Sequence, residues 1–369
     1  MGLRKIVGYV AINAAVLVGG YLSILFLAAL AQDAWRVTAG TWFEEEDKRV
    51  VSPAYDDRAY ARRVLADQKA ADYTYVPFVG WRQKPVATPT LNVGPDGNRR
   101  HTVGTDNRPG APTLGMFGGS TMWGTGVDDN GTIAALFDSF ADDYVVVNYG
   151  ERGHTSRQNL AQLANLINTG QTPDIAVFYS GYNDVWTHCN YAVTESLNGH
   201  MEERKIRSTL DERRDDAITY RQFLLPAVKA VRRLAGEGGA KAGYACANDP
   251  QRAEAVAEMM VATWEMARQL MLARGRELHV FLQPCAYLGR PNIAYLDVGG
   301  RRAGRREQFE AVYPLIKRKL AERGLDWVVD LTGAFDGDRA LYIDDAHVAV
   351  PGNMIIAREI YARIAPAAR

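Results

Sequence analysis

The chain has 369 residues, of which 47% are hydrophobic and 23% charged, so its composition is that of a globular protein with one large domain or two ordinary ones. Lysine and arginine total 43 and aspartate and glutamate total 43, which gives a formal net charge of zero. Because no broad basic field is present, the composition gives no indication of a nucleic-acid partner, and we expect none.

Residues 1–32 predict an N-terminal membrane anchor. The segment Ile6–Leu30 is almost wholly apolar and contains no charged residue. A helix of this length, at ~1.5 Å rise per residue, reaches roughly 37 Å and spans a bilayer. Arg4 and Lys5 precede it and acidic residues follow from position 33 on. The positive-inside rule then predicts a single-pass membrane protein whose body lies on the periplasmic or extracellular side.

Two alternatives to the anchor remain. Ala29-Leu30-Ala31 resembles a signal-peptidase site, but the apolar run is longer than the usual core of about 7–15 residues in a cleavable signal. A buried core helix is the other alternative, and the terminal position of the run argues against it. Both the anchor and the signal peptide predict that the body is exported.

Residues 33–110 are predicted to form a stalk and an extended arm. The stalk, residues 33–72, includes a helix around Ala54–Ala71, and the aromatic segment Tyr73–Lys84 is expected to pack across the body in an extended conformation. The sequence Gly94-Pro95-Asp96-Gly97 is typical of a tight turn.

In residues 111–369, short apolar segments alternate with segments of helical periodicity. The predicted strands are Thr113–Phe117, Tyr144–Asn148, Asp174–Tyr179, Leu278–Leu282 and Trp327–Asp330, and the predicted helices are Thr132–Phe140, Ser156–Asn168, Ala253–Arg274, Gln308–Arg323 and Pro351–Ile364. This alternation predicts an α/β fold with a parallel sheet covered by helices on both faces. Ligands of such sheets bind beyond the carboxyl ends of the strands.

An insertion at about residues 185–250 interrupts this alternation. Its segment Glu202–Arg214 is dense in charges of both signs and is expected to be a solvated helix, with a substrate-selecting lid as the alternative. Cys189 and Cys246 flank the insertion. They either form a disulfide, worth about 4 kcal/mol in the chain-entropy model, or are free thiols. Cys285 follows an apolar strand and is expected to be a small buried side chain.

Four short blocks occur in a fixed order after predicted strands or before the last helix. They are Gly118-Gly119-Ser120-Thr121, Asn148-Tyr149-Gly150-Glu151-Arg152-Gly153, Gly181-Tyr182-Asn183-Asp184 and Asp344-Asp345-Ala346-His347. Together they offer a nucleophile, donors for an oxyanion, a base and an acid that orients the base. That set of groups is the one required for ester chemistry through an acyl-enzyme.

Each block also has a plain structural interpretation. Ser120 occupies a glycine-rich turn that is neither a phosphate loop nor a Gly-x-Ser-x-Gly elbow, because Met122 follows. Taken by itself, Gly153 is an ordinary turn glycine, and the third block is a helix start whose N-cap is Asn183 or Asp184. Asp344 lies three residues before His347, close enough to fix its tautomer, and Asp345 is a competitor for this role.

The other histidines carry weaker signals. His154 directly follows Gly153 and is a candidate for the pocket lining, whereas His188 lacks partners at the spacing of metal ligands. His101, His200 and His279 are expected to be surface or packing residues. We predict no metal and no cofactor.

With these four blocks, the chain resembles the SGNH hydrolase superfamily, also called the GDSL esterase/lipase family, over most of Leu114–Ile364. The resemblance implies a flavodoxin-like three-layer α/β/α sandwich. It implies that Ser120 is the nucleophile and first oxyanion donor, that Gly153 and Asn183 are further donors, and that His347 is the base with Asp344 as its partner. Gly119 and Thr121 depart from the usual motif, and Trp123 is expected near the pocket mouth.

Three functions follow as hypotheses. The first is a membrane-anchored, exported serine esterase that hydrolyses O-acetyl or other short acyl esters, with cell-envelope glycans as the expected substrates. The second is a polysaccharide O-acyltransferase that uses the same acyl-enzyme and a membrane partner as acyl donor. The third is an inactive module that binds glycans.

Overall fold

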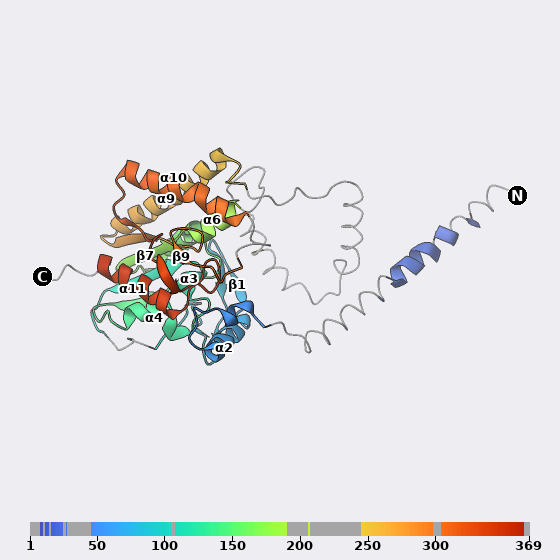
Figure 1. Cartoon of the computed structure of the whole chain (residues 1–369), viewed down its shortest axis with the longest axis horizontal. Coiled ribbons are helices and arrows are strands. Elements are labelled where there is room, and N and C mark those ends of the chain that lie inside the picture. The colour runs from blue at the N-terminus through green and yellow to red at the C-terminus, as the bar shows by residue number, and fades with distance from the viewer. Residues whose placement is uncertain are drawn as a thin grey trace. The chain divides into compact units, whose positions relative to one another are not determined.

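A computed structural model gives the structure of the chain (Figure 1). It describes residues 46–102, 104, 108–189, 206, 245–297 and 304–364, together with residues 8–9, 12–14, 16–24 and 27. Contacts divide the chain into two units, Met1–Glu46 with Asp211–Lys241, and Asp47–Leu210 with Ala242–Arg369. All helices and strands labelled below belong to the second unit.

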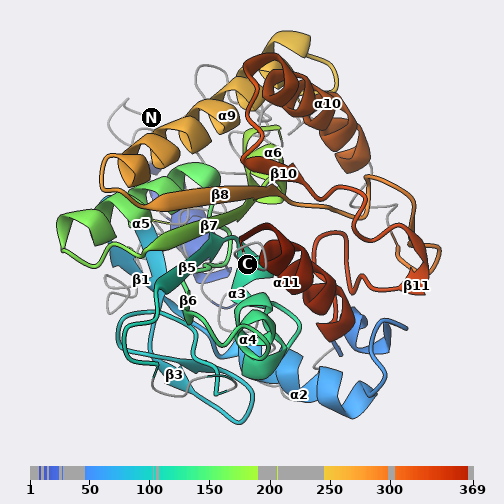
Figure 2. The same ribbon diagram turned by 90° about the vertical axis from the view of Figure 1, so that its left-hand side faces the viewer.

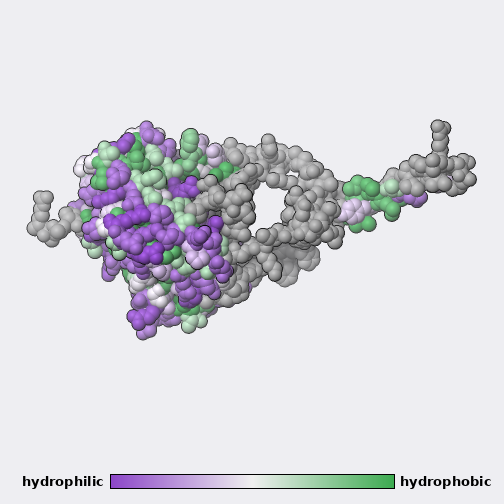
Figure 3. Space-filling model, turned by 90° about the horizontal axis from the view of Figure 1, so that it is seen from above, coloured by the Kyte–Doolittle hydropathy of each residue, from purple (hydrophilic) through white to green (hydrophobic). Residues whose placement is uncertain are grey.

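The predicted anchor, Ile6–Leu30, lies partly outside the described residues. Those of its residues that the structure does describe are helical and include exposed apolar side chains such as Val16 and Leu17, and they are coloured largely as hydrophobic in Figure 3. In the described parts of the chain, no helix is both long enough and apolar enough to cross a membrane. The spanning helix is therefore not confirmed.

A five-stranded parallel sheet forms the centre of the second unit. Its order is β10 (Val328–Asp330), β8 (Glu277–Leu282), β7 (Ile175–Ser180), β5 (Thr113–Gly118) and β6 (Val145–Asn148), with every neighbouring pair parallel. Numbered along the chain, these strands run 2-1-3-4-5 from the β6 edge, which is the flavodoxin-like order. The five predicted strands are thus confirmed, each within about one residue at either end.

Helices cover both faces of this sheet, as expected for a parallel sheet whose strands are apolar on both sides. Figure 2 shows α9 (Pro250–Leu272) and α10 (Arg305–Arg323) on one side, with α4 (Ile133–Asp138) and α11 (Val350–Ile364) on the other. Helices α5 (Ser156–Asn168) and α6 (Tyr182–Cys189) pack on the α9 side. The three-layer arrangement that the sequence predicts is therefore present.

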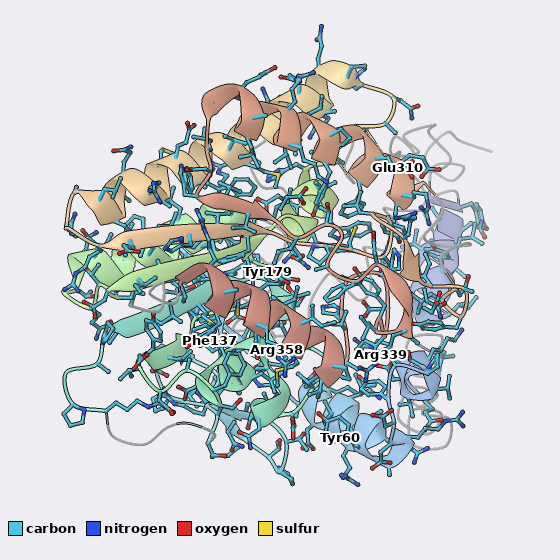
Figure 4. All side chains as sticks on the ribbon, turned by 60° about the vertical axis from the view of Figure 1, so that its left-hand side comes forward. Tyr60, Phe137, Tyr179, Glu310, Arg339 and Arg358 are labelled. Carbon is cyan, nitrogen blue, oxygen red and sulfur yellow. A yellow bond between two sulfur atoms is a disulfide. The ribbon has the colours of Figure 1, made fainter. Side chains whose placement is uncertain are left out.

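The side chains of β7 show how the strand serves two cores. Phe178 belongs to the core under α9 and α10, whereas its neighbours Val177 and Tyr179 belong to the core under α4 and α11. Phe137 from α4 lies in that second core, and Figure 4 shows it and Tyr179 between the sheet and the helices. Alternate residues of one strand thus bury on opposite faces.

The segment before the sheet packs onto the body. It contains η1 (Lys48–Val51), α2 (Arg58–Lys69), the antiparallel hairpin of β1 (Tyr73–Val76) and β2 (Gly80–Gln83), and the short pair β3 (Val86–Ala87) and β4 (Asn92–Val93).

Residues 33–72 are expected from the sequence to form a stalk, and Tyr73–Lys84 an extended arm that packs across the body. Instead, Val50, Ala61 and Leu65 share a buried cluster with Ile343 and Ala349, so residues from Asp47 on join the body. Residues 33–45 lie outside the described part. Tyr73–Lys84 forms the β1–β2 hairpin in place of a single extended arm.

The insertion is described only at its borders and at Ile206. The charged segment Glu202–Arg214, predicted as a helix or lid, lies otherwise outside the described residues. A disulfide joins Cys189, the last residue of α6, to Cys246, which confirms the bonded alternative. Cys285 is a free thiol and is buried, as expected. The remaining short elements are α3 (Ser120–Trp123), η2 (Asp129–Gly131), β9 (Pro291–Asn292) and β11 (Gly337–Ala340).

Candidate active site

Ser120 lies where strand β5 ends and helix α3 begins. It is the first residue of α3, with Gly119 as the N-cap, so its N–H has no partner inside the helix. Its Oγ lies 2.7 Å from Nε2 of His347. Gly119 permits this close arrangement, because a Cβ there would overlap Nδ2 of Asn183. A hydrogen bond of this length is the arrangement expected between a serine nucleophile and its base.

His347 is held by Asp344 in the turn before α11. The imidazole Nδ1 lies 2.9 Å from both carboxylate oxygens of Asp344. Backbone N–H groups of Ala346 and His347 donate to Oδ1 over 2.9 and 2.8 Å, which fixes the direction of the carboxylate. With Nδ1 as the donor to Asp344, Nε2 is the nitrogen that accepts the proton of Ser120.

The Asp344 carboxyl remains ionised in this setting. Burial acts to raise its pKa, but the charge and hydrogen bond of His347, followed by the charge of Arg49, outweigh burial and hold the pKa of Asp344 well below its usual range. An ionised carboxylate at this position stabilises the imidazolium that forms when His347 takes a proton.

The expected oxyanion donors meet at the same pocket as the serine. A cavity of about 230 Å³ is lined by Ser120, Gly153, Asn183 and His347 among others. Gly153 has a φ of 83°, a left-handed conformation that suits glycine. The Asn183 amide donates one N–H to the carbonyl of His154 over 2.8 Å, which fixes the amide and leaves its second N–H for a ligand. Asn183 lies inside α6, so the N-cap alternative does not hold.

Asp345, the competitor for orienting His347, has a different set of partners. Its Oδ2 accepts hydrogen bonds from the hydroxyls of Tyr182 and Tyr287, at 2.8 and 2.7 Å, and from Nη1 of Arg305 at 2.8 Å. This buried carboxylate therefore connects α6 and α10 to the turn before α11, and Asp344 is the carboxylate that contacts the His347 ring.

Two further residues of the motif blocks hold the loops in place. Asp184 accepts from the backbone N–H and the hydroxyl of Ser156, at 2.9 and 3.0 Å, and so fixes the start of α5 beside the Gly153 loop. Glu151, fully buried, accepts from the backbone N–H groups of Gln83 and Arg152, both at 2.8 Å. The blocks thus carry structural acids beside the catalytic groups, and the motif pattern alone does not separate the two kinds.

The other histidines lie away from the reacting atoms. His154 is buried, its Nε2 lies 3.0 Å from the carbonyl of Trp81, and it is absent from the pocket lining. Burial, with the charges of Arg157 and Arg252, lowers the pKa of His188 to about 4, so this residue is neutral at pH 7. His200 lies outside the described residues. Within the described part of the chain, no group of three or more histidine, cysteine, aspartate or glutamate residues is arranged to hold a metal ion.

Two tryptophans that sequence reasoning missed line the pocket. Trp81 comes from β2 and Trp186 from α6. The guanidinium of Arg305 lies 4.0 Å from the ring centre of Trp186 and holds that ring in place. Trp123, expected near the pocket mouth, is instead fully buried, with the guanidinium of Arg99 at 4.7 Å from its ring centre.

No family model matches the chain, and no curated protein matches it significantly. Similar solved structures include a carbohydrate acetylesterase family member from Sinorhizobium meliloti, with 16% identity, a TM-score of 0.36, and coverage of 69% of this chain and 100% of that one. A catalytic mutant of an acetylxylan esterase from Geobacillus stearothermophilus has 16% identity, a TM-score of 0.35, and coverage of 69% and 95%. A lipolytic protein of the G-D-S-L family from Veillonella parvula has 11% identity, a TM-score of 0.37, and coverage of 69% and 97%. These similarities are too low to establish function, so the site geometry carries the assignment.

Proposed function

We propose that the protein is a serine esterase of the SGNH hydrolase type that cleaves short acyl esters through an acyl-enzyme. The observation that carries this proposal is the continuous hydrogen-bonded chain from Asp344 through His347 to Ser120, at 2.9 and 2.7 Å. This series of hydrogen bonds ends at Ser120, in a pocket that Gly153 and Asn183 also line. This arrangement supports the assignment of a nucleophile, a base, an orienting acid and oxyanion donors to one site.

In the proposed reaction, Ser120 Oγ attacks the acyl carbon while His347 Nε2 takes its proton. The oxyanion that forms accepts hydrogen bonds from the N–H groups of Ser120 and Gly153 and from the Asn183 amide. His347 then gives the proton to the departing alcohol oxygen, which leaves an ester between the acyl group and Ser120. Water, activated by His347, hydrolyses this ester and restores the serine.

The size of the pocket supports a short acyl group. A cavity of about 230 Å³ is smaller than the roughly 300–1,000 Å³ of pockets that enclose drug-sized ligands. An acetyl group with part of its alcohol fits this space. The ring of Trp186 in the wall is partly exposed and offers an apolar surface to a sugar, whereas Trp81 is 2% exposed. O-acetyl groups on cell-envelope glycans are therefore the proposed substrates.

An exported, membrane-anchored location forms part of the proposal. The uncharged apolar segment Ile6–Leu30 supports it, and so does the Cys189–Cys246 disulfide, because disulfides persist in oxidising compartments and are rare in the cytosol. Acyl transfer to a glycan hydroxyl uses the same acyl-enzyme, with a sugar in place of water and a membrane partner supplying the acyl group. The assembled triad favours either reaction over a role as an inactive binding module.

The test is hydrolysis of p-nitrophenyl acetate, butyrate and octanoate by the full chain in detergent. We expect acetate to be the best substrate, and Ser120→Ala to abolish turnover. Ser139→Ala is the matched control, because Ser139 is an exposed serine at the end of α4. Full activity of Ser120→Ala, or a preference for octanoate, would contradict the proposal. Product analysis with an acetylated donor and an oligosaccharide then separates hydrolysis from transfer.

A further inference from the structure

The segment at the start of the compact unit lies against the turn that carries the catalytic acid and base. The Ser52 hydroxyl donates to the carbonyl of Tyr342 over 3.1 Å. Val50, 2% exposed, packs in one cluster with Ile343 and Ala349. Figure 2 shows this N-terminal segment, in blue, beside the red chain that leads into α11. The contacts bring a residue of η1 within reach of Asp344.

That residue is Arg49, whose Nη1 lies 3.5 Å from Oδ2 of Asp344. The guanidinium is fixed by Asp47, which accepts from Nε at 3.0 Å and from Nη2 at 2.7 Å. Asp47 also accepts from the backbone N–H of Arg49 at 3.0 Å. Burial opposes the charge of Arg49, but the hydrogen bond to Asp47 and the charges of Asp344 and Asp47 outweigh it and raise the pKa of Arg49. Arg49 is therefore a permanent, oriented cation beside the catalytic acid.

The two oxygens of Asp344 are held from different sides. Oδ1 accepts two backbone N–H groups of its own turn, and Oδ2 faces Arg49. His347 Nδ1 lies 2.9 Å from each oxygen. The cation and the backbone groups together fix the plane in which the carboxylate meets the imidazole.

We propose that Arg49 is a positioning residue of the reaction, an inference that rests on the proposed function. It orients the Asp344 carboxylate, and its positive charge lowers the proton affinity of the Asp344–His347 pair as a whole. Loss of this charge is therefore expected to change the pH dependence of the reaction, because a nearby like charge disfavours an added proton.

Other ionisable groups lie on two sides of the Asp344–His347 pair. Asp47 and Tyr55 belong to the N-terminal segment and interact with Arg49. On the opposite side, Asp345 is paired with Arg305 and accepts from Tyr182. A substitution of Arg49 by a neutral residue leaves Asp345 and Arg305 in place but removes the guanidinium that binds the Asp47 carboxylate, so a change in the pH profile reports on the Arg49–Asp47 pair.

The experiment compares Arg49→Gln and Arg49→Lys with wild type in the full chain. It measures kcat and KM for p-nitrophenyl acetate from pH 4 to pH 9, together with the rate of fluorophosphonate labelling at Ser120. For Arg49→Gln we expect kcat to fall about three- to tenfold with KM unchanged. The acid limb of kcat/KM should move up by about half a pH unit, because Arg49 is partly exposed and solvent screens its charge. Arg49→Lys should keep the acid limb near that of wild type.

Arg100→Gln is the matched control for loss of one positive charge. Arg100 is an exposed arginine paired with Asp96 at 2.9 Å, and we expect no change in its acid limb. If the wild type is active and Arg49→Gln has the same acid limb as wild type, the role of Arg49 is overturned while the proposed function stands. Equal losses of kcat in Arg49→Gln and Arg49→Lys, with the acid limb unshifted in both, would overturn it as well. An inert wild-type chain, with neither hydrolysis nor labelling, would overturn the proposed function and this inference with it.

Discussion

Replacing Asn183 with alanine removes a side-chain donor from the pocket beside Ser120. In the structure, the Asn183 amide donates one N–H to the carbonyl of His154, and we propose that its second N–H donates to the substrate oxygen. That second N–H is expected to strengthen its hydrogen bond when the carbonyl becomes an oxyanion. Loss of one such donor typically lowers kcat by 10²–10³-fold, or about 2.7–4 kcal/mol of transition-state stabilisation.

The same substitution has a separate cost in stability. It deletes the hydrogen bond to His154, which is worth about 1 kcal/mol to folding. The protein should therefore remain folded at 25 °C, and the two effects can be measured independently. Steady-state kinetics with p-nitrophenyl acetate give kcat and KM, and thermal unfolding gives the stability.

The expected result is a fall in kcat of at least 100-fold with KM within about twofold of wild type. Asn165→Ala, at an exposed position on α5, is the control and should leave both parameters unchanged. A folded Asn183→Ala variant that loses less than fivefold in kcat, or that loses activity through KM alone, would refute the assignment of Asn183 as an oxyanion donor.

Three further predictions follow. Gly119→Ala should lower kcat toward the level of Asn183→Ala, because its Cβ overlaps Nδ2 of Asn183; wild-type turnover would contradict the packing. Reduction of the Cys189–Cys246 disulfide should destabilise the fold by about 2–4 kcal/mol, which is measured as a lower Tm in dithiothreitol. An unchanged Tm would argue against a stabilising disulfide. Hydrogen bonds from α10 lower the pKa of Glu258 from 4.5 to about 2. The ionised Glu258 carboxylate therefore stabilises the fold at pH 7, and this contribution is lost as the pH falls through 2. Because the site is exposed, the contribution is below about 1 kcal/mol. Unfolding of Glu258→Gln should therefore differ from wild type at neutral pH and match it near pH 2.

The central sheet and the catalytic groups are predictable because their signals are local. The strand Thr113–Gly118 and the helix Ser156–Asn168 are visible as an apolar run and as a helical period, and the structure places them within a residue of the prediction. Ser120 and Asn183 follow neighbouring strands β5 and β7, on either side of the point where the strand order reverses. The topology alone therefore brings these two residues together.

The remainder depends on pairings between distant parts of the chain. From the sequence alone, the segment around Val50 is predicted to belong to a stalk. Only the structure shows that Val50 packs in one cluster with Ile343. The spacing and the resemblance favour Asp344 over its neighbour Asp345, and the direction of each side chain shows that Asp344 faces His347. Arg49 carries no motif at all. Its role is visible only as a distance to Asp344.

The most direct test of the central claim is fluorophosphonate labelling of the full chain, with the labelled peptide mapped by mass spectrometry. We predict labelling at Ser120, with a rate that falls by about 10³-fold or more in His347→Ala, because the base is what makes the hydroxyl nucleophilic. Folded protein that resists the probe, or that carries the label on another serine at a rate independent of His347, would contradict the account.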